Sequence, residues 1–138
     1  KDHELLRGLR KKTISFAETL RYPYASLLES APMTAAMRER ALLIGCRYEP
    51  VVEVPSFTIL VEVVRSGGLL AIAPYSAVAE GMTDLALTGL SDAWAARPMA
   101  FLAPASRPMR PDAEAFLEFA LSAEGAKYLP RGMTLSGH

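Results

Sequence analysis

The sequence has few of the residues from which catalytic and metal sites are built. Its 138 residues include one cysteine and two histidines, and His3 and His138 lie at opposite ends of the chain. Ser-His-Asp and Cys-His sites need a fixed imidazole base, and metal sites need clustered His, Cys or carboxylate ligands. A Gly-Lys-Ser phosphate loop and a G-x-G-x-x-G fingerprint are also absent. We therefore expect no catalytic residue, no metal site and no cofactor in this chain.

The sequence also lacks an excess of charge and any long apolar run. Its 15 Lys and Arg residues balance 15 Asp and Glu, whereas nucleic-acid binding needs a basic surface. The one basic run, Arg7 to Lys12, suits a solvated loop. No apolar run approaches the ~20 residues of a membrane span, no signal peptide is visible, and Cys46 alone cannot form an intrachain disulfide. These absences favour a cytoplasmic chain that contacts neither DNA nor a membrane.

The segment from Val51 to Pro74 predicts a strand, a helix, a glycine turn and a second strand. The first strand is rich in valine, which suits a buried pleated surface. Ser56 has the side chain of a helix N-cap, and Gly67 with Gly68 can end the helix because glycine tolerates positive φ. Such a βαβ unit needs a parallel sheet. The expected helical face is Ile59, Leu60, Val63 and Val64, and the expected second strand is Leu69 to Ala73.

Helix and strand signals alternate on both sides of this segment, which predicts the α/β fold class. The signals are a capping box, prolines at first helical positions and short apolar runs. The expected elements are a helix from Ser15 to about Leu20, a strand over Tyr22 to Leu28, a helix from Pro32 to Ile44, helical turns over Tyr75 to Glu80, strands over Asp84 to Thr88 and Arg97 to Ala103, a helix that opens at Pro111, and a helical piece over Ser122 to Leu129.

Two segments leave expected strands and enter expected helices. In an open parallel sheet, ligands bind beyond the carboxyl ends of the strands, where helix N-termini offer free N–H groups. Such a corner suits a small anion, for example a carboxylate. Alternatively, the hydroxyls there only cap their own helices. The segments are Glu29 to Thr34 and Pro55 to Thr58, with the hydroxyls of Ser30, Thr34, Ser56 and Thr58.

The expected helix from Pro32 to Ile44 carries Met33, Met37 and neighbouring alanines on one face. Methionine packs adaptably, so this face suits a partner helix as well as the core, where such residues are usually found. The pattern alone leaves both alternatives open.

Several segments follow one another in an order that one protein family shares. Val64, Gly67 and Pro74 stand at signature positions, and Leu69 replaces a second signature glycine. Asp2 to Leu5, with Glu4 in place of a proline, and Ile14 to Pro23 come before them, whereas Arg97 to Leu102 and Phe116 to Phe119 come after them. Over about Asp2 to Leu121, this set resembles the effector-binding domain of LysR-type transcriptional regulators.

This resemblance implies a periplasmic-binding-protein-like α/β domain of two lobes that senses a small molecule between them. The chain would hold one Rossmann-like lobe, lobe two, and the returning part of lobe one. It would be a fragment that contacts DNA only through a missing N-terminal winged helix-turn-helix domain. The expected division is an interlobe crossover over 1–12, lobe two over 13–73, a crossover with the returning part of lobe one over 74–129, and a tail over 130–138.

The resemblance also implies two sets of functional residues. Family effector contacts fall by position near the two strand-to-helix segments, on Ser30, Pro32, Met33, Thr34, Ser56, Phe57 and Thr58. Family dimers pair their lobes antiparallel through the helix that matches residues 32–44. This implies a homo-oligomer, a dimer or tetramer, whose interface includes Met33, Met37, Arg40 and Ala41.

Two other functions stay open at this point. A solute-binding lobe of an extracytoplasmic transport protein would share the fold, and Ser122 to Leu129 is similar to the closing helix of such proteins. An enzyme lobe of the same superfamily would need a base from another part of its protein. An upstream signal peptide would favour the transport protein, an upstream helix-turn-helix the regulator, and turnover by the intact protein the enzyme.

Overall fold

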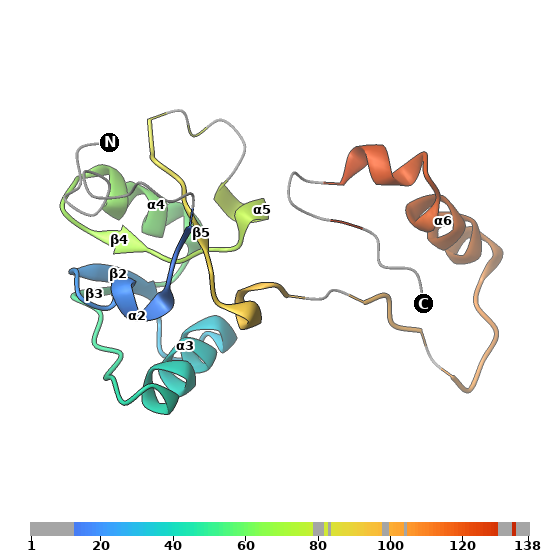
Figure 1. Ribbon diagram of the computed structural model, residues 1–138. Coiled ribbons are helices and arrows are strands. Elements are labelled where there is room, and N and C mark those ends of the chain that lie inside the picture. Colours follow the sequence, from blue (N-terminus) through green and yellow to red (C-terminus); the bar gives the residue numbers. More distant parts are fainter. Residues whose placement is uncertain are drawn as a thin grey trace. The chain divides into compact units, whose positions relative to one another are not determined.

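The structure is a computed structural model (Figure 1) that describes residues 13–78, 82, 84–97, 100–103, 105–129 and 134. The chain divides into two compact units, with the boundary in the sequence between Ala96 and Arg97. The expected crossover over 1–12 and nearly all of the expected tail over 130–138 lie outside the described residues. The division into lobes at residue 73 stays a prediction. No helix within the described ranges has the length and apolar character needed to cross a bilayer.

The first unit is built on a three-stranded parallel sheet with the order β3-β2-β4. β2 spans Tyr24–Leu27, β3 spans Val52–Val54 and β4 spans Leu70–Ala71. The register of the β2–β3 pair runs from Ala25 opposite Val52 to Leu27 opposite Val54, and Tyr24 lies opposite Leu70 in the β2–β4 pair. The parallel sheet and the α/β class expected from the sequence are therefore confirmed.

Two helices cover opposite faces of this sheet (Figure 1). α3, Pro32–Leu43, follows β2, and α4, Phe57–Arg65, follows β3. Side chains alternate along a strand, so Tyr24 and Ser26 face α3 whereas Ala25 and Leu27 face α4. Two hydrophobic clusters result. The cluster under α3 is Phe16, Tyr24, Met37, Ala41 and Tyr48, and the cluster under α4 is Ala25, Leu27, Val54 and Leu60.

Short elements complete the first unit. α2, Phe16–Thr19, begins at the expected capping box, in which the hydroxyl of Ser15 accepts from the N–H of Glu18. The Phe16 ring packs edge-on against Trp94 with 5.2 Å between ring centroids. The other elements are β1, Thr13–Ile14, which pairs in parallel with β5, Gly89–Leu90, the helix α5, Tyr75–Val78, and the 3₁₀ turn η1, Ala93–Ala95.

The regular secondary structure described in the second unit is helical. α6, Pro111–Leu121, opens with proline as expected, and the 3₁₀ turn η2 spans Gly125–Tyr128. The ring of Phe119 lies 5.9 Å from that of Tyr128, and Phe116 lies 6.1 Å from Phe101. Phe116 nevertheless keeps 60% of its surface exposed.

Three expectations for the strands and helix faces are wrong. Residues 84–88 form no strand; the strand lies at Gly89–Leu90, where β1 supplies its partner. Arg97 and residues 100–103 also form no strand, since a strand needs a partner and the described part of the second unit contains none. On α4 the buried pair is Leu60 and Val61, whereas Ile59 is 44% exposed. β4 is also shorter than expected and only half-buried.

Candidate functional site

β2 and β3 end side by side at one edge of the sheet. Leu27 lies opposite Val54, and the N–H of Leu28 donates to the carbonyl of Val54 at 3.0 Å. α3 and α4 begin shortly after these strand ends and cover opposite faces. Their N-termini therefore open at the same edge, one on each side of the sheet. The structure thus brings the segments 29–34 and 55–58 to one edge.

The two helix starts differ in how they are capped. The hydroxyl of Ser56 accepts from the N–H of Ile59 at 3.4 Å, so α4 has the expected side-chain cap. α3 starts after Ala31 and has no side-chain cap. Its first residue, Pro32, has no N–H to satisfy. The missing N–H of Pro32 and the capped N–H of Ile59 leave two donors in the first three residues of each helix, those of Met33 and Thr34 in α3 and those of Phe57 and Thr58 in α4.

The predicted contact residues differ in exposure. Thr34 is fully buried at 0% exposure, so its hydroxyl does not reach solvent. Met33 packs against both hydrophobic clusters, and Phe57 packs against the cluster under α4. Hydroxyls with access to solvent are those of Ser30, Ser56 and Thr58. The assignment of effector contacts stays a prediction, and these three hydroxyls are its accessible part.

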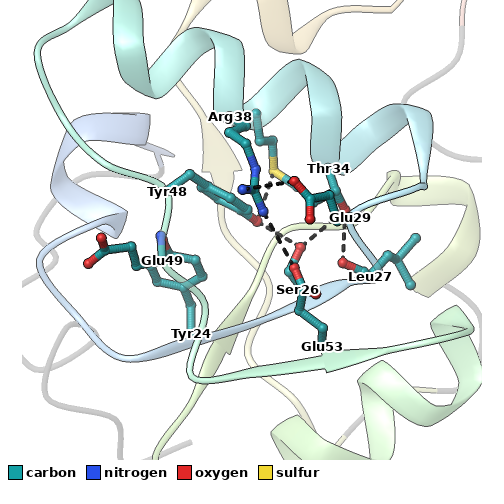
Figure 2. Close-up of polar contacts among 10 residues, drawn as sticks. Tyr24, Ser26, Leu27, Glu29, Thr34, Arg38, Tyr48, Glu49 and Glu53 are labelled. Atoms are coloured by element: carbon teal, nitrogen blue, oxygen red, sulfur yellow. Dashed lines mark hydrogen bonds and ion pairs between the residues drawn. The ribbon is translucent and has the colours of Figure 1, made fainter.

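Thr34 belongs instead to a hydrogen-bonded chain beneath α3 (Figure 2). Its hydroxyl donates to the carbonyl of Leu27 at 3.0 Å and lies 3.2 Å from the hydroxyl of Ser26. The phenol of Tyr48 donates to Ser26 at 2.9 Å. Nearby, the N–H of Glu49 donates to the Tyr24 phenol oxygen at 2.6 Å. These contacts fix the start of α3 and the segment before β3 to the central strand.

Arg38 lies beside this chain and joins the carboxylate of Glu29, in the turn after β2, to that of Glu53, in β3 (Figure 2). Its Nη1 is 3.1 Å from Oε1 of Glu29, and its Nη2 is 3.7 Å from Oε1 of Glu53. The Nε atom of Arg38 is buried and has no hydrogen-bond partner within the part of the chain that the structure describes. The Arg38 side chain is 39% exposed and that of Glu29 is 71% exposed, so this is a partly solvated contact. The three groups together carry one net negative charge.

Burial changes the acidity of the two tyrosines in this region. Desolvation raises the pKa of Tyr48 to about 12, although the hydrogen bond with Ser26 acts in the opposite direction. Desolvation also raises the pKa of Tyr24, against the effect of its hydrogen bond from the Glu49 backbone. Both phenols therefore stay protonated at neutral pH, which suits a structural role in which Tyr48 donates to Ser26 and Tyr24 accepts from the Glu49 backbone.

The residues predicted at the dimer interface divide between core and surface. Met37 is 1% exposed and Ala41 is 0% exposed, and both belong to the cluster under α3. Arg40 lies on the surface, with its guanidinium carbon 5.8 Å from the centroid of the Trp94 ring. Their interface role stays a prediction, but only Arg40 and part of Met33 are accessible to a partner.

The buried chain of Tyr48, Ser26 and Thr34 was not predicted as a unit from the sequence. The available signal was the serine within the apolar run that forms β2, because a buried serine needs a partner. Among the described residues, no group of three or more His, Cys, Asp or Glu side chains could hold a metal ion. The candidate site is the sheet edge with the accessible hydroxyls of Ser30, Ser56 and Thr58, and it lies beside the buried hydrogen-bonded hydroxyls of Tyr48, Ser26 and Thr34.

Comparison with known protein families identifies the chain. A family model for the LysR substrate-binding domain matches residues 1–124. A search of curated proteins finds no significant match. The match covers most of the 138 residues, and the parallel α/β structure is consistent with it. The chain therefore belongs to the LysR substrate-binding domains, the effector-binding domains of LysR-type transcription regulators.

Proposed function

We propose that this domain binds a small metabolite at the edge where β2 and β3 end, and passes its occupancy to the oligomer of a LysR-type regulator. The observation that carries the proposal is that the parallel strands β2 and β3 end side by side. The helix after β2 covers one face of the sheet and the helix after β3 covers the other. Ligands of open α/β sheets bind at such edges. DNA contact is assigned to the DNA-binding domain of the parent protein.

The chemistry of the corner favours a ligand with hydrogen-bond acceptors. Ser30, Ser56 and Thr58 offer hydroxyls, and the uncapped start of α3 offers N–H groups. A carboxylate suits these donors. The net negative charge of Glu29, Arg38 and Glu53 nearby disfavours a polyphosphate. A small neutral or monoanionic metabolite therefore fits the corner better than a highly charged one.

Calorimetry on hydroxyl variants tests the corner. A thermal-shift screen of small carboxylic acids first identifies a ligand, because a ligand that binds the native state raises the melting temperature. The double variant Ser56→Ala with Thr58→Ala should then weaken binding by about tenfold, the loss expected for one or two hydrogen bonds. Thr58 is exposed, and the hydrogen bond by which Ser56 caps α4 is long at 3.4 Å. Loss of both hydroxyls should therefore leave the domain folded.

A matched control comes from the other end of α4. Ser66→Ala removes an exposed hydroxyl that donates to the carbonyl of Val63, and it should leave ligand affinity unchanged. Unchanged affinity in the double variant would exclude these hydroxyls as contacts. A domain that binds no member of a broad metabolite screen, although it is folded, would contradict the proposed function itself.

A further inference from the structure

The guanidinium of Arg38 contacts two carboxylates that differ in distance and in exposure (Figure 2). Glu29 is the first residue of the segment 29–34, and its carboxylate is 3.1 Å from Nη1. The Glu29 side chain is 71% exposed, whereas that of Glu53, in β3, is 32% exposed and lies 3.7 Å from Nη2. An exposed ion pair contributes little to stability. Another anion can therefore replace Glu29 at Arg38 at little cost.

The guanidinium of Arg38 is used less fully than those of two other arginines. A guanidinium carries five N–H donors in a planar fork, which suits two parallel bonds to one carboxylate. Arg65 binds Asp84 in this way, through Nε at 2.6 Å and Nη2 at 3.3 Å, and Arg110 binds Asp112 through the same two atoms. In the described part of the chain, Nε of Arg38 has no partner at all. Arg38 thus keeps unused capacity for a carboxylate.

We propose that Arg38 binds the carboxylate of the metabolite, and that Glu29 occupies Arg38 in the free domain as a competitor within the chain. This proposal rests on the proposed function and deepens it, because it names the ligand class, a monocarboxylic acid, and the residues that select it. On binding, the ligand carboxylate takes the place of Glu29 at Nη1, and Glu29 turns into solvent. Glu53 stays beside Nη2 and holds the guanidinium in position.

The charges around Arg38 select one carboxylate over two. Arg38 and Glu53 together are neutral, so a monocarboxylate brings one negative charge to this pair. Glu29 remains nearby in the turn after its displacement and adds a second one. A dicarboxylate would add a third, and like charges in one place repel. A neutral amide of the same shape forms no charge-assisted hydrogen bond and competes poorly with Glu29. Arg38 therefore discriminates between ligands by their charge.

Benzoate and benzamide are matched probes of this site, because they have nearly the same shape and differ in charge. NMR titration of the 138-residue chain at constant ionic strength should give a dissociation constant for benzoate in the millimolar range. It should be at least about fivefold lower than that for benzamide. Benzoate should also shift the side-chain Nε–H resonance that is missing from the spectrum of Arg38→Gln. In that variant the two constants should agree within about twofold.

Glu29→Gln tests the competitor, at an exposed position where the fold should tolerate it. It should strengthen benzoate binding by about two- to fivefold, since the ligand no longer displaces an ion pair. Two controls change the net charge elsewhere. Glu39→Gln removes one negative charge from an exposed position of α3, and Arg47→Gln removes one positive charge from a side chain that is 86% exposed. Both should leave the benzoate constant within about 1.5-fold of the wild type, because salt screens exposed charges. Circular dichroism checks that every variant is folded.

Three results would overturn the proposal. They are equal affinity of the wild type for benzoate and benzamide, an unchanged affinity for benzoate in Arg38→Gln, and a gain in Glu39→Gln as large as that in Glu29→Gln. The metabolite screen keeps this proposal apart from the proposed function. A metabolite that loses affinity in the variant Ser56→Ala with Thr58→Ala, but not in Arg38→Gln, would refute the role of Arg38 and leave the proposed function standing.

Discussion

The hydroxyl oxygens of Ser26 and Thr34 lie 3.2 Å apart beneath α3, and the direction of their hydrogen bond is determined by the groups around them. The proton of Thr34 goes to the carbonyl of Leu27, which can only accept. Ser26 must therefore donate to Thr34, and it accepts from Tyr48. The result is one directed chain, from Tyr48 through Ser26 and Thr34 to the backbone of β2, in which each hydroxyl proton has an acceptor.

Thr34→Val is expected to destabilise the first unit without lowering its affinity for a ligand. Valine keeps the shape of threonine but removes both the donor to Leu27 and the acceptor for Ser26, which leaves buried polar groups unsatisfied. The free energy of unfolding should fall by about 1–3 kcal/mol. Urea denaturation measures this change. Ser30→Ala, at an exposed position, should change stability by less than about 0.5 kcal/mol. Equal stability of Thr34→Val and the wild type would mean that the buried chain is not formed.

Tyr48→Phe is expected to make the free energy of unfolding fall less steeply at high pH than it does in the wild type. The folded-state pKa of Tyr48 is raised to about 12, so between pH 10 and 12 the unfolded chain releases this proton while the folded chain keeps it. The stabilisation is complete below pH 10 and is lost as the pH rises towards 12. The wild type should lose up to about 2 kcal/mol more than Tyr48→Phe over this interval.

Urea denaturation of both proteins at several pH values gives this difference, and absorbance of the phenolate checks the titration directly. Tyr75→Phe, at an exposed position of α5, controls for the loss of a surface hydroxyl. Parallel pH profiles for the wild type and Tyr48→Phe would show that the phenol is not desolvated in the folded protein.

Local signals predicted several helix ends correctly. The capping box of Ser15 and Glu18 joins residues only three positions apart, and Ser56 caps α4 in the same way. Gly67 and Gly68 adopt φ values of 98° and 82°, as the expected glycine turn requires. Each of these features is formed within a few residues, so the sequence of the segment determines it.

Features that depend on distant partners could not be predicted in this way. The apolar pattern favoured a strand over residues 84–88, but β5 forms at Gly89–Leu90, where β1, far away in the sequence, supplies a partner. The phenol of Tyr48 and the hydroxyl of Ser26 are 22 residues apart, and neither segment alone indicates the contact. Periodicity assigned Met37 to a face of α3 but did not decide between core and interface, because that depends on which side meets the sheet.

Met37→Ala is expected to destabilise the first unit strongly. The side chain is 1% exposed and its sulfur lies 3.6 Å from the Tyr48 phenol, so truncation leaves a cavity beneath α3. The free energy of unfolding should fall by about 2–5 kcal/mol. Leu42→Ala on the outer side of the same helix should cost less than about 1 kcal/mol. Equilibrium denaturation at low protein concentration compares them, and similar losses would contradict the assignment of inner and outer faces.

Gly125→Ala is expected to disturb the second unit alone. A Cβ at this buried position would lie 2.1 Å from the carbonyl oxygen of Phe119, and a backbone atom cannot move aside as a flexible side chain can. The junction of α6 and η2 must therefore shift, at a cost of about 1–3 kcal/mol typical of overpacking. Amide hydrogen exchange should become faster in α6, because this measurement reports local opening of a unit.

Trp94, which packs against Phe16 in the first unit, provides the internal control for this variant. It is the single tryptophan of the chain, so its fluorescence reports unfolding of the first unit, and that transition should be unchanged in Gly125→Ala. Gly68→Ala gives the complementary case. Its Cβ would meet open space, but the φ of 82° strains alanine by about 1–2 kcal/mol, so the tryptophan transition should move and exchange in α6 should not. Unaltered exchange in α6 of Gly125→Ala would mean that this helix and η2 do not meet at Gly125.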